Sequence, residues 1–424
     1  MKNHMLRLGG LALGVALLAT GALAQTNRVD TVSPMAPELA TYGTHSIGVR
    51  TTQVTDLNRV DIVRTKEGSP VARYDRTLTL EVWYPARLRA DQREGGEYKA
   101  VTREPSITAT LYGKAVRDAD PLTTEGAFPL VIVSHGYPGN RFLMSHLCEN
   151  LASKGFVVVA IDHKESTYDD QQAFASTLYN RPFDQLFVLN AVAVLGARGS
   201  GSFLAGIVDD SRTGVVGYSM GGYGLLNVVG GGYSDASVTA SGSPPNRLLA
   251  QRAASNPEYA RAGDARIRAA IAVAPWGMQA GFWDANGLSG IHTPVLFVAG
   301  SADSVAGYEK GTKAAFEGAV NANRYLLTFV NANHNAGAPI PAPVETYAYS
   351  ERMKSYPFLH YADAVWDSVR MNNILDHFAT AYFNLYLKGQ SNMAAYLDPP
   401  ASGDLKGFQP RSAVGLTLEH RPAR

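Results

Sequence analysis

Short apolar runs alternate with amphipathic segments along most of the chain. Continuous apolar runs, typical of strands that a sheet buries on both faces, occur at FPLVIVSHG (128–136) and FVVVAIDH (156–163). Other strand-like patterns lie at residues 77–86, 213–219, 267–276, 293–304 and 323–334. Apolar residues at helical spacing occur at residues 140–155, 182–198 and 368–389. This alternation predicts an α/β protein with a mostly parallel central sheet and helices on both faces.

Two residues indicate where predicted helices end or begin. Gly155 follows the first of these helical segments and suits the end of a helix. Pro182 begins the second, and we expect it in the first turn, where the missing N–H has no helical partner to lose.

Other regions divide the chain into parts. Residues 25–45 are polar and contain proline, which predicts an extended lead-in. The main domain is expected to span residues 46–390, with an N-terminal strand extension. An insertion rich in Gly, Ser, Ala and Asn is expected at about 230–264, after a helix that begins at Met220. Residues 391–424 are expected to form a C-terminal tail.

The first residues have the pattern of an export signal. Lys2 and Arg7 precede the apolar run LGGLALGVALLATG, and the small residues around Ala24 suit a cleavage site before Gln25. A membrane anchor is the alternative, but the run is short for a span and no later segment is longer. We therefore expect residues 1–24 to be removed on export to the periplasm or beyond, with no transmembrane span in the mature chain.

Composition narrows the function classes. The 424 residues are 46% hydrophobic and 18% charged, with a formal charge of +1, which gives no electrostatic reason to expect nucleic acid as a partner. Cys148 is the only cysteine, so an intrachain disulfide is excluded, and its helical context predicts core packing. The glycines at 230–232 follow a helix instead of opening one, which argues against a phosphate site. We expect no metal and no cofactor.

The stretch TGVVGYSMGGYGLL (213–226) carries the clearest chemical signal. GYSMGG ends a predicted strand and opens a predicted helix, the context of a G-x-S-x-G turn that presents a nucleophilic serine. The alternative is a tight turn that happens to contain a hydroxyl. We expect Ser219 to be a nucleophile, which then needs a base to take its proton.

An acid and a base follow in the order Ser, acid, His. Asp303 lies in the turn after one predicted strand, and His334 in the turn after the next. Carboxyl ends of parallel strands meet at one edge of a sheet, so all three side chains can converge there. Weaker candidates are Asp284 for the acid and His360 for the base.

Three further histidines have sequence contexts that do not suit a catalytic base. His292 precedes its strand and is expected at the wrong edge of the sheet. His377 lies within the helical segment 368–389, where packing or solvation is the simplest role. His135 ends a buried strand and is expected to bond neighbouring backbone.

Two backbone N–H groups are expected to stabilise a developing oxyanion. One belongs to Met220, the residue after the nucleophile. The other is assigned to Tyr137 in VIVSHGYPGN, because the neighbouring Pro138 has no N–H to donate.

These motifs resemble those of a known family. HGYPGN, GYSMGG, GSADS and NANH are similar to motifs of α/β-hydrolases of the dienelactone-hydrolase-like and platelet-activating-factor-acetylhydrolase-like group, over residues 45–390. LASKGFVVVAIDH, AVAPWG and SADSV are similar to bacterial cutinase-type polyester hydrolases. The resemblance implies the α/β-hydrolase fold, a Ser219–His334–Asp303 triad and an oxyanion hole at Tyr137 and Met220.

The resemblance also implies that Trp276 forms an aromatic wall of the site that binds the acyl group, with core packing as the alternative.

The chain differs from both of these families in its cysteine usage. Dienelactone hydrolases use a cysteine nucleophile where this chain has serine, so lactone chemistry does not follow. Polyester hydrolases usually carry a disulfide near the C-terminus, which a single cysteine cannot form.

The sequence thus predicts an exported serine hydrolase that cleaves carboxylic esters through an acyl-enzyme. The alternatives are a peptidase or thioesterase on the same scaffold, or a non-catalytic binding protein. The ester could be a small molecule, a lipid or a polymer, and the sequence does not indicate an oligomeric state.

Overall fold

The computed structural model describes residues 26–260, 263–400 and 405–424. The predicted export signal, residues 1–24, lies outside the described residues.

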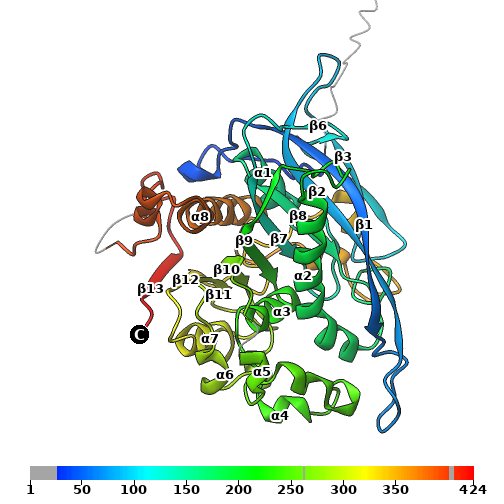
Figure 1. Ribbon diagram of the computed structural model, residues 1–424. Coiled ribbons are helices and arrows are strands. Elements are labelled where there is room, and N and C mark those ends of the chain that lie inside the picture. Colours follow the sequence, from blue (N-terminus) through cyan, green and yellow to red (C-terminus); the bar gives the residue numbers. More distant parts are fainter. Residues whose placement is uncertain (1–25, 261–262, 401–404) are drawn as a thin grey trace, which may run out of the picture.

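A twisted central sheet organises the molecule (Figure 1). Eleven strands form it in the described chain, in the order β13-β12-β11-β10-β9-β7-β8-β2-β1-β5, with β6 paired to β2. They are β1 (Ser46–Val60), β2 (Arg73–Arg87), β5 (Val116–Arg117), β6 (Asp120–Pro121), β7 (Phe128–Ser134), β8 (Val157–Asp162), β9 (Val208–Tyr218), β10 (Ile267–Val273), β11 (Val295–Gly300), β12 (Arg324–Phe329) and β13 (Leu416–Arg421). A separate hairpin pairs β3 (Glu97–Val101) with β4 (Thr108–Tyr112).

The middle of the sheet is parallel and its margins are antiparallel, except that the short strand β5 runs parallel to β1. Strands β8, β7, β9, β10, β11 and β12 run parallel to their neighbours in that order. Antiparallel pairs add β2 beside β8, β1 beside β2, and β13 beside β12. The mostly parallel sheet predicted from the sequence is confirmed, whereas no strand was predicted at the residues of β13 or of the β3–β4 hairpin, and β1 was covered only by an N-terminal strand extension without bounds.

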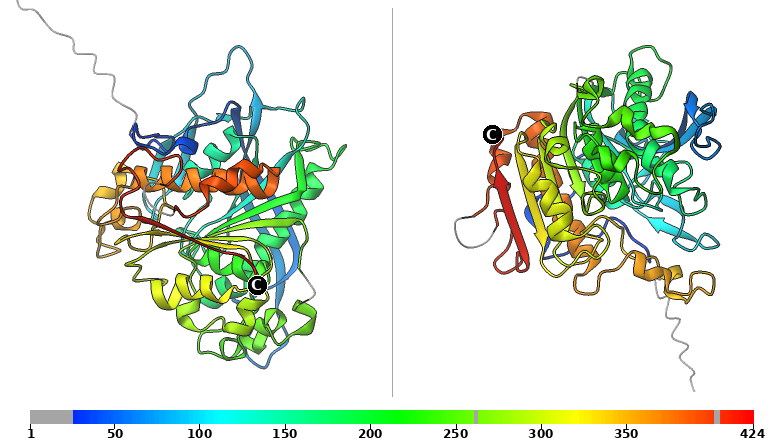
Figure 2. Two further views of the ribbon diagram at one scale, coloured as in Figure 1. Left: turned by 90° about the vertical axis from the view of Figure 1, so that its left-hand side faces the viewer. Right: turned by 90° about the horizontal axis from the view of Figure 1, so that it is seen from below.

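Helices cover both faces of the sheet (Figure 2). They are α1 (Ser145–Ser153), α2 (Phe174–Gly196), α3 (Met220–Val228), α4 (Asp235–Val238), α5 (Pro257–Ala260), α6 (Ala285–Ser289), α7 (Lys313–Gly318) and α8 (Ser368–Lys388). Helices α1 and α8 pack on one face, and α2, α3 and α7 on the other. Val131 and Val133 of β7 enter the first core, and Leu130 and Ile132 enter the second. Burial on both faces explains the continuous apolar runs of the central strands.

The position of Pro182 differs from the prediction. Helix α2 begins at Phe174, so Pro182 lies inside it and not in its first turn. A proline there removes the hydrogen bond to the carbonyl of Leu178, four residues earlier. The Tyr223 hydroxyl of α3 donates to that carbonyl instead, at 3.2 Å. A contact between helices therefore replaces the backbone bond, and the helix continues.

Two connecting segments lie outside the sheet and its main helices. Residues 230–264 contain α4, the 3₁₀ helix η2 (Pro245–Arg252) and α5. Residues 335–367 contain the 3₁₀ helices η5 (Val344–Tyr347) and η6 (Pro357–His360). Among the described residues, no helix is long and apolar enough to cross a membrane.

Candidate active site

Ser219 occupies a strained turn between β9 and α3. Its φ is +53°, a backbone region that residues with a side chain seldom adopt. The Ser219 N–H donates to the carbonyl of Val273 at 2.9 Å, and its own carbonyl accepts from the N–H of Trp276 at 3.1 Å. These bonds to the last residue of β10 and to the chain after it hold the turn in place.

Glycines allow the turn to pack closely. A Cβ on Gly221 would lie 2.0 Å from the carbonyl oxygen of Ser134, and one on Gly217 would lie 2.3 Å from the carbonyl oxygen of Gly221. Only glycine therefore fits where the first turn of α3 approaches the end of β7. This explains the glycines around the serine.

Asp303 lies in the turn after β11, with its side chain fully buried. One carboxylate oxygen accepts from the N–H groups of Val305 at 2.8 Å and Ala306 at 2.9 Å. Burial alone would raise the pKa of this carboxyl group, but hydrogen bonds from His334 and these two N–H groups lower it overall. Asp303 is therefore an anion at neutral pH.

His334 connects Asp303 to Ser219. Its Nδ1 lies 2.9 Å from Oδ2 of Asp303, and its Nε2 lies 2.9 Å from Oγ of Ser219. A carboxylate only accepts hydrogen bonds, so Nδ1 must carry the proton. Nε2 is then free to accept the proton of the serine hydroxyl.

Neighbouring groups fix the imidazole. Oδ1 of Asn333 accepts from the backbone N–H groups of Ser304 at 2.9 Å and His334 at 2.8 Å, which ties the two turns together. The ring of Tyr218 lies against the imidazole, with centroids 5.3 Å apart. Sequence patterns did not single out Asn333 or Tyr218, because their contacts join different strands.

The two predicted oxyanion donors lie beside this arrangement. Tyr137 lines the cavity that contains Ser219, and within the described chain its N–H has no hydrogen-bond acceptor. Met220 is the first residue of α3, where an N–H has no partner inside the helix. Both groups are available to an incoming oxygen.

Arg181 holds the loop that carries Tyr137. This fully buried side chain of α2 donates to the carbonyl of His135, to that of Gly136 at 2.8 Å and to Oγ of Ser166 at 2.6 Å. Burial lowers the pKa of the guanidinium to about 9, partly offset by the negative charge of Asp184.

His135 forms the hydrogen bond to neighbouring backbone that its sequence position predicted. Its Nδ1 donates to the carbonyl of Gly136 at 2.6 Å.

A second serine–histidine–aspartate chain lies behind the loop. Oγ of Ser134 is 2.8 Å from Nε2 of His163, whose Nδ1 is 3.0 Å from Oδ2 of Asp184. All three residues are fully buried, and burial lowers the pKa of His163 to about 3. No substrate reaches Ser134, so this chain supports the end of β7.

A cavity of about 270 Å³ opens above Ser219 and His334. Its wall includes Tyr137, Val305 and Leu359. Trp276 is absent from the residues that line it in the described structure. Trp276 is half-buried and packs edge-to-face on Phe174 at 5.5 Å, and Phe174 packs in the same way on Tyr137. The indole ring thus lies behind a wall residue, although the backbone N–H of Trp276 bonds the carbonyl of Ser219.

The weaker candidates take other positions. Asp284 caps α6 by accepting from the N–H of Gly287 at 2.8 Å. Nε2 of His360 forms a hydrogen bond of 2.8 Å with the Tyr168 hydroxyl, at the edge of the Ser219 cavity. His377 accepts from the N–H of Leu39 at 3.1 Å in the core.

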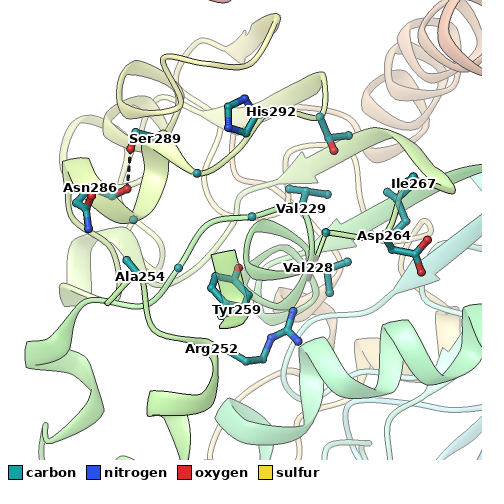
Figure 3. Close-up of a pocket in the computed structure, with 17 residues that line it drawn as sticks. Val228, Val229, Arg252, Ala254, Tyr259, Asp264, Ile267, Asn286, Ser289 and His292 are labelled. Carbon is teal, nitrogen blue, oxygen red and sulfur yellow. Dashed lines mark hydrogen bonds between the residues drawn. The ribbon is translucent and has the colours of Figure 1, made fainter. Parts of the chain in front are cut away.

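A larger cavity of about 450 Å³ lies elsewhere (Figure 3). Ile267, the first residue of β10, and Thr293, just before β11, place it at the amino ends of these strands. His292 lines it, which agrees with the prediction that this histidine is at the wrong edge. The cavity contains none of the predicted site residues.

A parallel sheet with a strained serine between a central strand and the following helix is the architecture of an α/β-hydrolase. Comparison with known proteins narrows the class. A family model described as PET hydrolase-like matches residues 94–241, which include Ser219, Tyr137 and Met220. The fold is that of an α/β-hydrolase, as the sequence predicted, and the matched part of the chain is similar to PET hydrolase-like proteins.

Individual relatives are distant. A bis(hydroxyethyl) terephthalate hydrolase of Streptomyces coelicolor is 25% identical over 59% of this chain and 64% of the relative. Cutinase 2 of Thermobifida cellulosilytica is 27% identical over 42% of this chain and 48% of the relative. The chain thus spans between about half and just under two thirds of these curated relatives. A solved ferulic acid esterase from Streptomyces cinnamoneus covers 93% of this chain and 99% of its own, with a TM-score of 0.57 and 20% identity, a likeness of fold.

Proposed function

We propose that this protein is a serine hydrolase that cleaves carboxylic esters. The observation that carries the proposal is the hydrogen-bond chain from Oγ of Ser219 through His334 to Asp303, with 2.9 Å at both imidazole nitrogens. Relatives named as hydrolases of esters support the substrate class.

In the first half of the reaction, Oγ of Ser219 attacks the ester carbonyl carbon while Nε2 of His334 takes the hydroxyl proton. The carbonyl oxygen becomes an anion and accepts hydrogen bonds from the N–H groups of Tyr137 and Met220. Asp303 stabilises the imidazolium. The carbon–oxygen bond to the alcohol then breaks, and the alcohol leaves with the proton from Nε2.

In the second half, water attacks the acyl group on Ser219. His334 takes a proton from the water and returns it to Oγ as the acid leaves. The reaction consumes one water and yields one acid and one alcohol. Trp276 supports the acyl side of the pocket through Phe174, a less direct role than a wall.

Labelling and turnover test the proposal together. The native protein should react with a fluorophosphonate and hydrolyse p-nitrophenyl esters, with little activity on aminoacyl amides. Ser219→Ala should lose the label and at least about 10³-fold in turnover while folding normally. Turnover near the native rate in Ser219→Ala would refute the mechanism, and faster cleavage of amides would indicate a peptidase.

Export and domain organisation belong to the same proposal. Residues 1–24 act as a signal, and residues 46–390 with their insertion form the catalytic unit. Mass spectrometry of the protein recovered from outside the cytoplasm should find a chain that begins at Gln25. A chain that retains Met1 would refute cleavage.

A further inference from the structure

Helix α2 contacts both backbone segments that carry the proposed oxyanion donors. Tyr137 lies in the loop after β7, and Met220 is the first residue of α3. Two N–H groups bind one oxygen anion together only when each lies about 3 Å from the same point. The separation of the two segments therefore matters as much as the direction of each N–H.

Arg181 of α2 holds the first segment. Its guanidinium donates to the carbonyl oxygen of Gly136 at 2.8 Å. This carbonyl and the Tyr137 N–H belong to one planar peptide group, so they point in opposite directions and move together. One end of the proposed oxyanion site is thus fixed to α2.

Gln185 of α2 holds the second segment. It follows Arg181 by about one helical turn, so both side chains lie on the same face of the helix. Nε2 of Gln185 donates to the carbonyl oxygen of Gly221 at 2.9 Å, in the first turn of α3. Gly221 directly follows Met220, so the other end of the oxyanion site is fixed to the same helix.

Helices α2 and α3 pack closely at this point (Figure 1). A Cβ on Gly224 of α3 would lie 2.9 Å from Cβ of Arg181 and 3.0 Å from Nε2 of Gln185. Only glycine allows α3 to approach these two side chains so closely. The first turn of α3 is therefore held against α2 by direct contact.

The unused half of the Gln185 amide favours a role beyond packing. Gln185 is 1% exposed, and within the described part of the chain its Oε1 has no hydrogen-bond partner. A buried amide oxygen without a partner costs free energy, which an apolar side chain of similar length would avoid. The carbonyl of Gly221 only accepts, so the amide must turn its NH₂ group towards it. The donor is thus the half of the amide that this position uses.

We propose that Gln185 is a positioning residue, which together with Arg181 sets the separation of the two oxyanion donors. This inference rests on the proposed esterase function and adds a residue on which its oxyanion site depends. Without the Gln185 bond, the first turn of α3 can move away from the Tyr137 loop. The carbonyl oxygen becomes an anion only as Oγ or water attacks, so the loss falls on kcat more than on KM.

The experiment uses two variants of Gln185 and one control. Gln185→Met keeps the length of the side chain without a donor, and Gln185→Glu has a carboxyl group that donates only when protonated. The control, Thr213→Val, also removes one buried hydrogen bond to backbone, the bond of 2.7 Å from the Thr213 hydroxyl to the carbonyl of Asp210. Thr213 pairs with Ile267, the first residue of β10, at the other end of the sheet.

We expect Gln185→Met to lower kcat on p-nitrophenyl acetate about tenfold, with KM within about twofold of native, because both half-reactions pass through an oxyanion. Affinity for butylboronic acid, which forms a tetrahedral adduct with a catalytic serine, should fall by a similar factor. Thr213→Val should match the native protein in kcat and in this affinity, although its melting temperature falls as much as that of Gln185→Met. Native kcat in Gln185→Met, or a higher KM with unchanged kcat, would overturn the proposal.

Gln185→Glu tests the donor itself. At about pH 6 protonation of the new carboxyl group is favoured more than at about pH 8, so kcat relative to the native protein should rise and exceed that of Gln185→Met. A relative kcat no higher than that of Gln185→Met at either pH would contradict the need for a donor.

The native protein separates this inference from the function. If it hydrolyses no ester, the proposed function fails and the positioning role falls with it. If native hydrolysis is normal and Gln185→Met behaves like Thr213→Val, the positioning role alone fails and the function stands.

Discussion

Arg181 donates a hydrogen bond of 2.8 Å to the carbonyl oxygen of Gly136, the residue directly before Tyr137. A second guanidinium nitrogen bonds the carbonyl of His135. Two successive carbonyls held by one rigid side chain fix the peptide planes of the loop, and hence the direction of the next N–H. Arg181 thus fixes the direction of the Tyr137 N–H, the group proposed above to bind the oxyanion.

Replacing this arginine should therefore affect the transition state more than substrate binding. Arg181→Lys keeps a charge but cannot bond both carbonyls in the same geometry. We expect kcat on p-nitrophenyl esters to fall at least about tenfold with KM changed less than about twofold.

Arg324→Lys is the matched control. Arg324 is also a buried arginine that donates to backbone carbonyls, those of Ala322 and Pro422, but it lies at the start of β12 at the other edge of the sheet. Equal losses of kcat in the two variants would mean that Arg181 has only a general structural role.

Asp303→Asn should change the tautomer of His334. If the Asn oxygen keeps the bonds from the N–H groups of Val305 and Ala306, its NH₂ group faces Nδ1 of His334. Nδ1 must then accept, so the proton moves to Nε2, which can no longer take the serine proton. We expect kcat to fall about 10⁴-fold with an almost unchanged melting temperature. A modest fall would indicate that Asp303 does not determine the tautomer.

Local sequence patterns account for the meeting of three side chains at one end of the sheet. Ser219, Asp303 and His334 each follow a predicted strand, and parallel strands bring their carboxyl ends to one edge. Residues whose role depends on distant partners were missed. Arg181 lies in a helical pattern that gives no sign of the loop it will bond, and Pro182 beside it was placed at a helix start because its compensating contact comes from Tyr223.

Strands β1 and β13, near the two edges of the sheet, also depend on contacts with residues far away in the sequence. Strand β1 has exposed and half-buried residues over much of its length, so its apolar pattern is weak. Its antiparallel pairing with β2 keeps it in the sheet. Strand β13 is six residues long and pairs with β12, its only neighbour among the strands that the structure describes. Pairing over long sequence separations, and not local periodicity, determines these strands.

A methyl group at Gly221 should displace the nucleophile turn. The added Cβ would lie 2.0 Å from the carbonyl oxygen of Ser134. Relieving this clash requires the backbone of α3 or of β7 to move. We expect Gly221→Ala to lower the free energy of unfolding by about 2–4 kcal/mol and to abolish fluorophosphonate labelling. Gly263→Ala is the control, because a Cβ there meets no atom within 4 Å. Normal labelling of Gly221→Ala would refute the close approach of α3 to β7.

Acid should loosen the segment that carries η5 and η6 by protonating Glu104. Hydrogen bonds from Ser350 and Arg352 lower the pKa of this carboxyl group from 4.5 to about 2. In the unfolded chain the Glu104 carboxyl group keeps its ordinary pKa and therefore binds a proton more readily than in the folded protein. Ionised Glu104 thus contributes its full share to the free energy of unfolding above about pH 4.5, and this contribution is lost as the pH falls towards 2. Glu104→Gln should therefore have a lower melting temperature than the native protein at pH 6, with the difference shrinking below pH 4.5. A difference in melting temperature that persists unchanged to pH 2 would contradict this linkage.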